Sequence, residues 1–195
     1  WQWASLWRAP HRLAFFSGVL LLVASAAWWA VVQVDRASGV FGLSYAVSPT
    51  LTHAAVMTLG FMPLFFAGFL FTAGPKWLGV DAPDARAITP ALALQVTGWL
   101  VWLAGAHLHQ DVAVAGALLA AAGLGTQNLR FWRLWRASRV PDRVHATVVA
   151  LGGTLGALCA AGIGVALLLG EWSVALALVH TALWGFIVAT YVAVA

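Results

Sequence analysis

The chain has 195 residues, of which 63% are hydrophobic and only 8% are charged. Soluble domains carry about 25% charged residues, so this composition excludes a soluble globular domain and indicates a polytopic membrane protein. The net charge of +4 does not indicate a nucleic-acid partner, because the basic residues gather in short segments between apolar spans. A single cysteine, Cys159, excludes a disulfide framework and thiolate metal clusters.

The first twelve residues combine several tryptophans with Arg8 and Arg12. Aromatic rings beside basic residues are typical of a segment that lies at the membrane surface. The stretch Ser48-Pro49-Thr50 precedes the second apolar run. Residues of these types favour a helix start, so we expect them to cap the second span.

The apolar runs predict six membrane-spanning helices that form an all-α bundle with short loops. We expect Pro83 and Pro90 to break the chain before the third span, and the spacing of Gly152 and Gly156 to allow close helix packing in the fifth. We expect one bundle over residues 1–195, as a part of a longer chain. The expected spans are about 13–34, 51–73, 91–108, 112–135, 144–169 and 173–195.

The distribution of basic residues predicts the orientation of the bundle. Successive spans cross the membrane in opposite directions, so the loops divide between two ends of the bundle. Only Arg36 lies at one end, and the other basic residues lie at the opposite end. Basic loops favour the cytoplasm. We therefore expect the N-terminus and the end of the sixth span to be cytoplasmic. The residues at the cytoplasmic end are Arg8, Arg12, Lys76, Arg86, Arg130, Arg133, Arg136, Arg139 and Arg143.

Four histidines fall toward the outer end of this topology. His53 opens the second span, His107 and His109 end the third, and His180 lies roughly 10 Å below the outer end of the sixth. Imidazole suits haem iron, copper and zinc, so we expect these four to bind a cofactor. A polar residue inside a span also favours a functional role for His180. The alternatives are an interfacial role for His53 and solvated turns for His107 and His109.

One methionine is a candidate metal ligand, and two histidines are secondary candidates. Met57 follows His53 by four residues and so shares its helix face, and a thioether is a soft donor that favours Cu(I). We expect a metal site to draw on His53, Met57 and His180. His11 and His145 lie at the cytoplasmic end, where headgroup contact is the alternative to ligation. Met57 could equally be a packing residue.

The sequence also excludes several chemistries. The acidic residues all fall in predicted loops, so no carboxylate lies in a span to relay protons or bind a coupling cation. This argues against an ion-coupled transporter or a proton pump. No nucleophile–base pair and no glycine-rich phosphate loop is present, which leaves no support for a hydrolase. The acidic residues are Asp35, Asp81, Asp84, Asp111, Asp142 and Glu171.

Several motifs together resemble the NnrS family. The second span carries the most specific of them, and the resemblance extends over all six spans. The residues that carry it are His53-Ala54, Met57, Gly60-Phe61, Ala67-Gly68-Phe69-Leu70, Thr72-Ala73, Pro75 and Trp77, with Pro10-His11-Arg12-Leu13, Phe15-Phe16, Gly18, Arg143, His145-Ala146, His180 and Trp184-Gly185-Phe186. Where the family motif has a second His and a Glu, this chain has Ala55 and Val56, so a ligand set that needed both would be incomplete.

The resemblance implies a multi-pass protein of the bacterial cytoplasmic membrane that contains haem and copper. It also implies a link to denitrification and to the response to nitric oxide. Family members are about twice as long as this chain, so this chain corresponds to an N-terminal half. The lipid bilayer and a small gaseous ligand such as nitric oxide are the expected partners.

Three hypotheses follow from the sequence. The first is a haem-binding and copper-binding protein, not an enzyme, that protects against or senses nitric oxide. The second is a haem–copper redox enzyme that acts on small nitrogen oxides or oxygen. The third is a structural or permease-like bundle in which the histidines are incidental.

Overall fold

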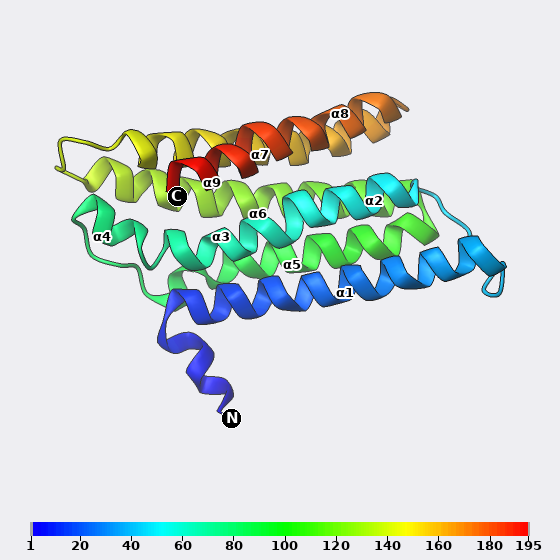
Figure 1. The fold of residues 1–195 in the computed structure, drawn as a ribbon, viewed down its shortest axis with the longest axis horizontal. Helices are drawn as coiled ribbons and strands as arrows, with labels where there is room; N and C mark the ends of the chain where they lie inside the picture. Colours follow the sequence, from blue (N-terminus) through cyan, green and yellow to red (C-terminus); the bar gives the residue numbers. More distant parts are fainter. Residues whose placement is uncertain (1, 195) are drawn as a thin grey trace.

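The computed structural model describes residues 2–194, which form helices and short connections without any strand (Figure 1). Six of these helices are long and apolar enough to cross a membrane. The expected all-α bundle of six spans is therefore confirmed. Trp1 of the predicted surface segment and Ala195 at the predicted end of the sixth span lie outside the described residues.

Two of the six spans are interrupted by π-helical turns, and two short helices lie outside the spans. The second span comprises α2 (Pro49–Ala55), η2 (Val56–Phe61) and α3 (Met62–Leu70), and the sixth comprises α8 (Trp172–Ala182), η3 (Leu183–Val188) and α9 (Ala189–Val194). The other spans are α1 (Pro10–Ser38), α5 (Ala85–Leu108), α6 (Gln110–Ala137) and α7 (Val144–Leu168). The short helices are the 3-10 helix η1 (Trp3–Arg8) and α4 (Gly74–Leu78).

The third span begins earlier than the sequence predicted. Asp84 caps the helix start, where its side chain accepts a hydrogen bond from the Arg86 backbone N–H at 2.8 Å. Pro83 lies before the helix, but Pro90 lies inside it, so the prediction that Pro90 breaks the chain is wrong. Pro90 falls in the second turn and is exposed at the end of the bundle. A proline is tolerated near a helix start, because few intrahelical bonds are lost there.

Two acidic residues that were expected in loops lie in helices. Asp111 is in the first turn of α6, and Asp35 is buried in the last turns of α1. The Asp35 carboxylate accepts three backbone N–H hydrogen bonds, from Phe41, Gly42 and Leu43, at 2.8 to 2.9 Å. These bonds fold the α1–α2 loop back onto the end of α1. Asp35 therefore has a structural role in the loop.

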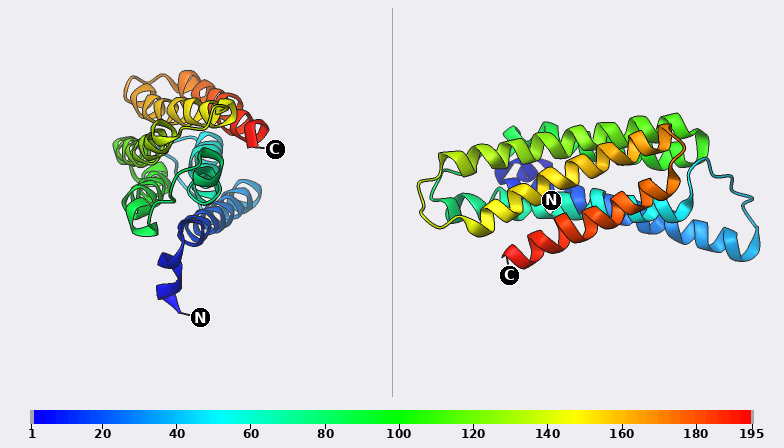
Figure 2. Two further views of the ribbon diagram at one scale, coloured as in Figure 1. Left: turned by 90° about the vertical axis from the view of Figure 1, so that its left-hand side faces the viewer. Right: turned by 90° about the horizontal axis from the view of Figure 1, so that it is seen from above.

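The six spans lie side by side with their long axes roughly aligned (Figures 1 and 2). Helices α5, α6 and α7 pack on one another in chain order, and α8 follows against α7. The second span packs against α1 and also contacts α8. It also contacts α5 and α6, so its neighbours come from several parts of the chain.

The closest helix contact is between α5 and α6, and four glycines make it possible. A Cβ atom on Gly116 would lie 2.5 Å from the Trp102 backbone nitrogen, and one on Gly123 would lie 2.7 Å from that of Gln95. Gly98 and Gly105 of α5 meet the α6 backbone in the same way, at Ala120 and Ala113. Each pair is spaced by seven residues, so each forms a line along its helix. Small residues let helix backbones approach closely in a membrane.

The glycines of α7 serve a different purpose from the one expected. A Cβ on Gly156 would meet the Phe186 ring, and one on Gly153 would meet the Asn128 side chain. Gly152 is the nearest to a backbone contact, with the Gly185 carbonyl oxygen at 3.4 Å. These glycines mainly make room for side chains of the neighbouring helices.

The two ends of the bundle differ in charge. Arg8, Arg12, Lys76, Arg86 and the arginines of 130–143 lie where α1, α5 and α7 begin and α6 ends, the left-hand end in Figure 1. We call this the basic end. Arg36 lies at the opposite end, beside the α1–α2 loop.

The α5–α6 contact predicts which glycines are sensitive to substitution. Gly105→Ala is expected to destabilise the protein by about 1–3 kcal/mol, because the new methyl group overlaps the α6 backbone. Unfolding of the purified protein in detergent, followed by circular dichroism, measures the effect. Gly125→Ala on α6 is the matched control, because its Cβ would find only Ala157 at 3.9 Å. Equal stability of the two variants would contradict the close contact.

The charge difference predicts the orientation. Alkaline phosphatase fused to the chain can report the orientation, because this enzyme becomes active only where its disulfides form, outside the cytoplasm. We expect the enzyme to be active when fused within the α1–α2 loop at Gly39, and inactive when fused at Ser138 after α6. The opposite pattern would show that the basic end faces outward.

Candidate functional site

The helix that carries His53 is shaped by a proline nearly three turns further on. Pro63 has no backbone N–H, and its ring excludes the usual bond to the carbonyl of Leu59. The helix widens into the π-helical turn η2 directly before this proline. Trp99 of α5 donates its indole N–H to the Leu59 carbonyl at 3.1 Å. The π-helical turn is therefore held against α5, and such turns are frequent at functional sites.

His53 is oriented by two side chains of α1. The hydroxyl oxygen of Ser25 lies 3.4 Å from His53 Nδ1 and forms a hydrogen bond with it. The Trp29 ring stacks on the imidazole with a centroid distance of 4.5 Å and an interplanar angle of 11°. Among the described residues, the other imidazole nitrogen, Nε2, has no hydrogen bond. Ser25 and Trp29 thus fix the orientation of the His53 ring. In the tautomer whose Nδ1–H donates to the Ser25 hydroxyl oxygen, the lone pair of Nε2 has no partner among the described residues.

His180 has the same position relative to a π-helical turn on the sixth span, but its surroundings differ from those of His53. It lies on the exposed side of α8, and no described residue forms a hydrogen bond with it. The π-helical turn η3 begins three residues after His180, just as η2 begins three residues after His53. Helix α8 contacts both α2 and η2. The helices that carry these two histidines therefore pack against each other, with half-buried Met57 on the first of them.

His107 uses both of its ring nitrogens within the protein. Its Nδ1 hydrogen-bonds the Ser44 carbonyl at 2.9 Å, which places the proton on Nδ1. Its Nε2 accepts the indole N–H of Trp28 at 2.7 Å. A histidine in this state has no free lone pair for a metal ion. His107 instead joins α1, α5 and the α1–α2 loop.

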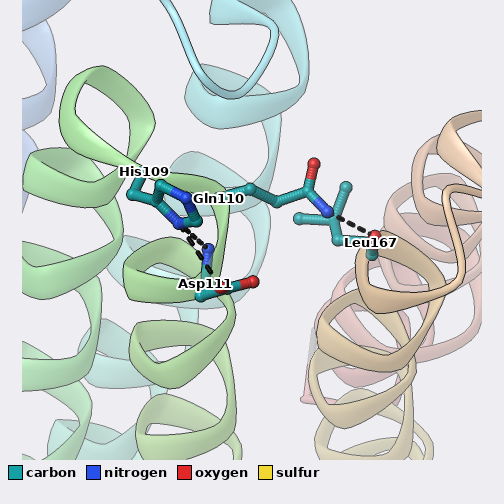
Figure 3. Close-up of polar contacts among 4 residues, drawn as sticks. All are labelled: His109, Gln110, Asp111 and Leu167. Carbon is teal, nitrogen blue, oxygen red and sulfur yellow. Dashed lines mark hydrogen bonds and ion pairs between the residues drawn. The ribbon is translucent and has the colours of Figure 1, made fainter.

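His109 lies at the turn between α5 and α6 (Figure 3). Its Nδ1 accepts the backbone N–H of Asp111 at 3.2 Å and lies 3.4 Å from that carboxylate. The His109 side chain is 67% exposed. The next residue, Gln110, donates to the Leu167 carbonyl at 2.6 Å and so links the turn to α7. His109 acts as a cap of α6.

The structure places the four predicted histidines at the same end of the bundle, but in separate surroundings. Among the described residues, no three His, Cys, Asp or Glu side chains lie close enough together to hold a metal ion. His53 and His107 are related through α1, because they contact Trp29 and Trp28, whose rings are 6.1 Å apart. His53 is half-buried and His180 is exposed, on helices that contact each other.

Sequence reasoning did not identify the residues that orient these histidines. Ser25, Trp28 and Trp29 are spaced by three and four residues, so they form one stripe on α1. A polar residue and two indoles within one turn of an apolar helix are a recognisable signal.

The two secondary histidines lie at the basic end. His11 Nδ1 is 3.4 Å from the Thr72 hydroxyl, which links the start of α1 to the end of the second span. The His145 ring meets the Trp77 ring edge-on, with centroids 5.5 Å apart. These contacts place both histidines far along the bundle from His53, so they do not share its site.

Comparisons with known proteins identify one family. Residues 5–195 match the model of the NnrS protein family. No curated protein matches the chain, and no solved structure matches it. The family match covers all six spans.

The bonding of His107 predicts an energetic coupling to Trp28. Trp28→Phe and His107→Phe are each expected to cost about 1–3 kcal/mol, because each leaves a polar partner unsatisfied. The double variant should cost less than the sum, with a coupling energy of about 1 kcal/mol. Unfolding in detergent measures all three. Trp172→Phe combined with His107→Phe is the control pair, and the losses of stability in this pair should be additive. Coupling in the control pair but not between Trp28 and His107 would contradict the assigned hydrogen bond.

Proposed function

The chain belongs to the NnrS family, and from this membership we propose that it binds haem through histidines of its bundle and takes part in the response to nitric oxide. The match over residues 5–195 is the observation that carries the proposal. The proposed location is the bacterial cytoplasmic membrane, with the basic end in the cytoplasm. His53 and His180 would then lie toward the outer side.

The environment of His53 fits a haem ligand. Haem iron takes an imidazole nitrogen as its axial ligand, and a ligating histidine usually has its other nitrogen held by a neighbouring group. At His53, the Ser25 hydroxyl oxygen would accept the Nδ1–H and Trp29 would fix the ring plane, so that Nε2 would be the atom that holds iron. His180, on a helix in contact with α2, is the proposed second ligand.

The other predicted residues support this proposal to different degrees. His107 has no free nitrogen in this arrangement, so we propose a packing role for it. Among the described residues, Nε2 of His109 has no hydrogen bond, but His109 serves as a helix cap at the surface. Copper would depend on His53, His180 and the Met57 thioether, because the described residues offer no cluster of three hard or imidazole ligands. We therefore propose haem as the main cofactor.

The chain's contribution would be to hold the imidazole and to select the ligand. Haem supplies an iron site that binds small molecules such as nitric oxide. The second span has no charged residue between Thr50 and Pro75, so its surroundings favour a small uncharged ligand over an ion. Ser25 and Trp29 would keep the His53 ring from rotating. Protection or sensing would follow from ligand binding alone.

An optical spectrum tests the proposal. Protein purified after haem-supplied expression should show a Soret band, and His53→Ala or His180→Ala should remove it or shift it strongly. His53→Gly with added imidazole should restore the band, since free imidazole replaces the side chain. Ser25→Ala should weaken haem affinity by about tenfold, the effect expected when a group that orients a ligand is lost.

His109→Ala is the matched control and should leave the spectrum unchanged. Absence of a Soret band in the unsubstituted protein would overturn the haem proposal and favour a structural bundle. Catalytic turnover of nitric oxide with an electron donor would instead favour the redox enzyme.

A further inference from the structure

A cavity of about 650 Å³ lies in the corner between η1 and the start of α1. Helix η1 turns away from the bundle, so that it crosses the direction of the spans (Figure 1). The Trp3 ring on η1 meets the Phe16 ring on α1 edge-on, with centroids 6.0 Å apart. The lining includes Gln2, Ser5, His11, Arg12, Phe16 and Val19.

The lining changes from polar to apolar along α1. Arg12 and His11 stand at its start, while Phe16 and Val19 follow one and two turns further into the span. Arg12 and Val19 are separated along the helix axis by about 10 Å. Phe16 and Val19 are 38% and 52% exposed. A ligand that fills this cavity must therefore be polar at one end and apolar at the other.

The polar end of the cavity is positively charged. Arg12 donates to the Ser5 carbonyl at 3.4 Å, which leaves its charge uncompensated. Arg8 ends η1 on the same corner. Among the described residues, no ion pair involves either arginine. An anion at this corner would supply the missing countercharge.

We propose that this cavity binds one anionic phospholipid, with the phosphate at Arg12 and an acyl chain along Phe16 and Val19. The position at the end of the spans is where lipid headgroups lie, and basic residues there attract anionic lipids. The tryptophans of η1 suit the same interface. The site is separate from the proposed haem histidines, His53 and His180, which lie toward the other end of the bundle.

Native mass spectrometry of the protein tests the site. Protein is taken from nanodiscs of phosphatidylcholine with phosphatidylglycerol, and the retained lipids are counted. The unsubstituted protein should keep one phosphatidylglycerol in preference to phosphatidylcholine. Arg12→Gln should lower this retention about fivefold, the effect expected for one cation near an anionic headgroup. Arg36→Gln, at the other end, is the control and should retain the lipid.

A second pair of variants tests the apolar half of the cavity without changing its charge. Val19→Trp should fill the cavity and reduce retention, whereas Val23→Trp, one turn further on and outside the lining, should not. The proposal would be overturned if the unsubstituted protein retained both lipids equally. It would also be overturned if Arg12→Gln retained as much phosphatidylglycerol as the unsubstituted protein. Full competition by inorganic phosphate would overturn it too, because it would show an anion site without a lipid chain. Loss of the Soret band in Arg12→Gln, with lipid retention unchanged, would assign the cavity to haem instead.

Discussion

The close contact between the backbones of α5 and α6 fixes much of this bundle. Four glycines bring the two helices together, because any Cβ at those positions would overlap the opposite backbone. Trp99 directly follows Gly98, and its indole N–H reaches the Leu59 carbonyl that Pro63 leaves without its usual partner. The helix pair thereby anchors the π-helical turn behind His53. In a membrane such a carbonyl needs a partner from the protein, since lipid offers none.

The hydrogen bonds of the ring nitrogens distinguish His53 from His107, which the sequence analysis places in one group. His107 donates a hydrogen bond from one ring nitrogen and accepts one at the other. Both ring nitrogens are therefore used to join α1, α5 and the α1–α2 loop. His53 forms a hydrogen bond through Nδ1, and its Nε2 has no hydrogen bond to any described residue. The same helix, α1, supplies the partners of both, through a stripe of Ser25, Trp28 and Trp29. The packing histidine and the candidate ligand thus differ in whether the second ring nitrogen has a hydrogen-bond partner.

The two ends of the bundle have different chemical character. One end holds His53 and His180 on contacting helices, within spans that carry no charge near them. The other end carries nearly all the basic residues and the η1 segment, which crosses the direction of the spans. A cofactor site and a lipid site can therefore coexist without sharing residues. Helix α1 is common to both, since it begins at the lipid cavity and carries Ser25 and Trp29 further along.

The sequence alone determined the class, the six spans, the resemblance to the NnrS family and the charge difference between the ends. These follow from local quantities: the length of apolar runs, the positions of charges and short motifs. It did not place Pro90 inside α5 or Asp35 inside α1, because caps and loop contacts outweigh single-residue preferences. Only the tertiary structure decided which face each helix presents. The rotation of each helix about its axis depends on its neighbours in space. This rotation turned Gly98 and Gly105 toward the α6 backbone. It also gave His107 two hydrogen-bond partners and His53 one.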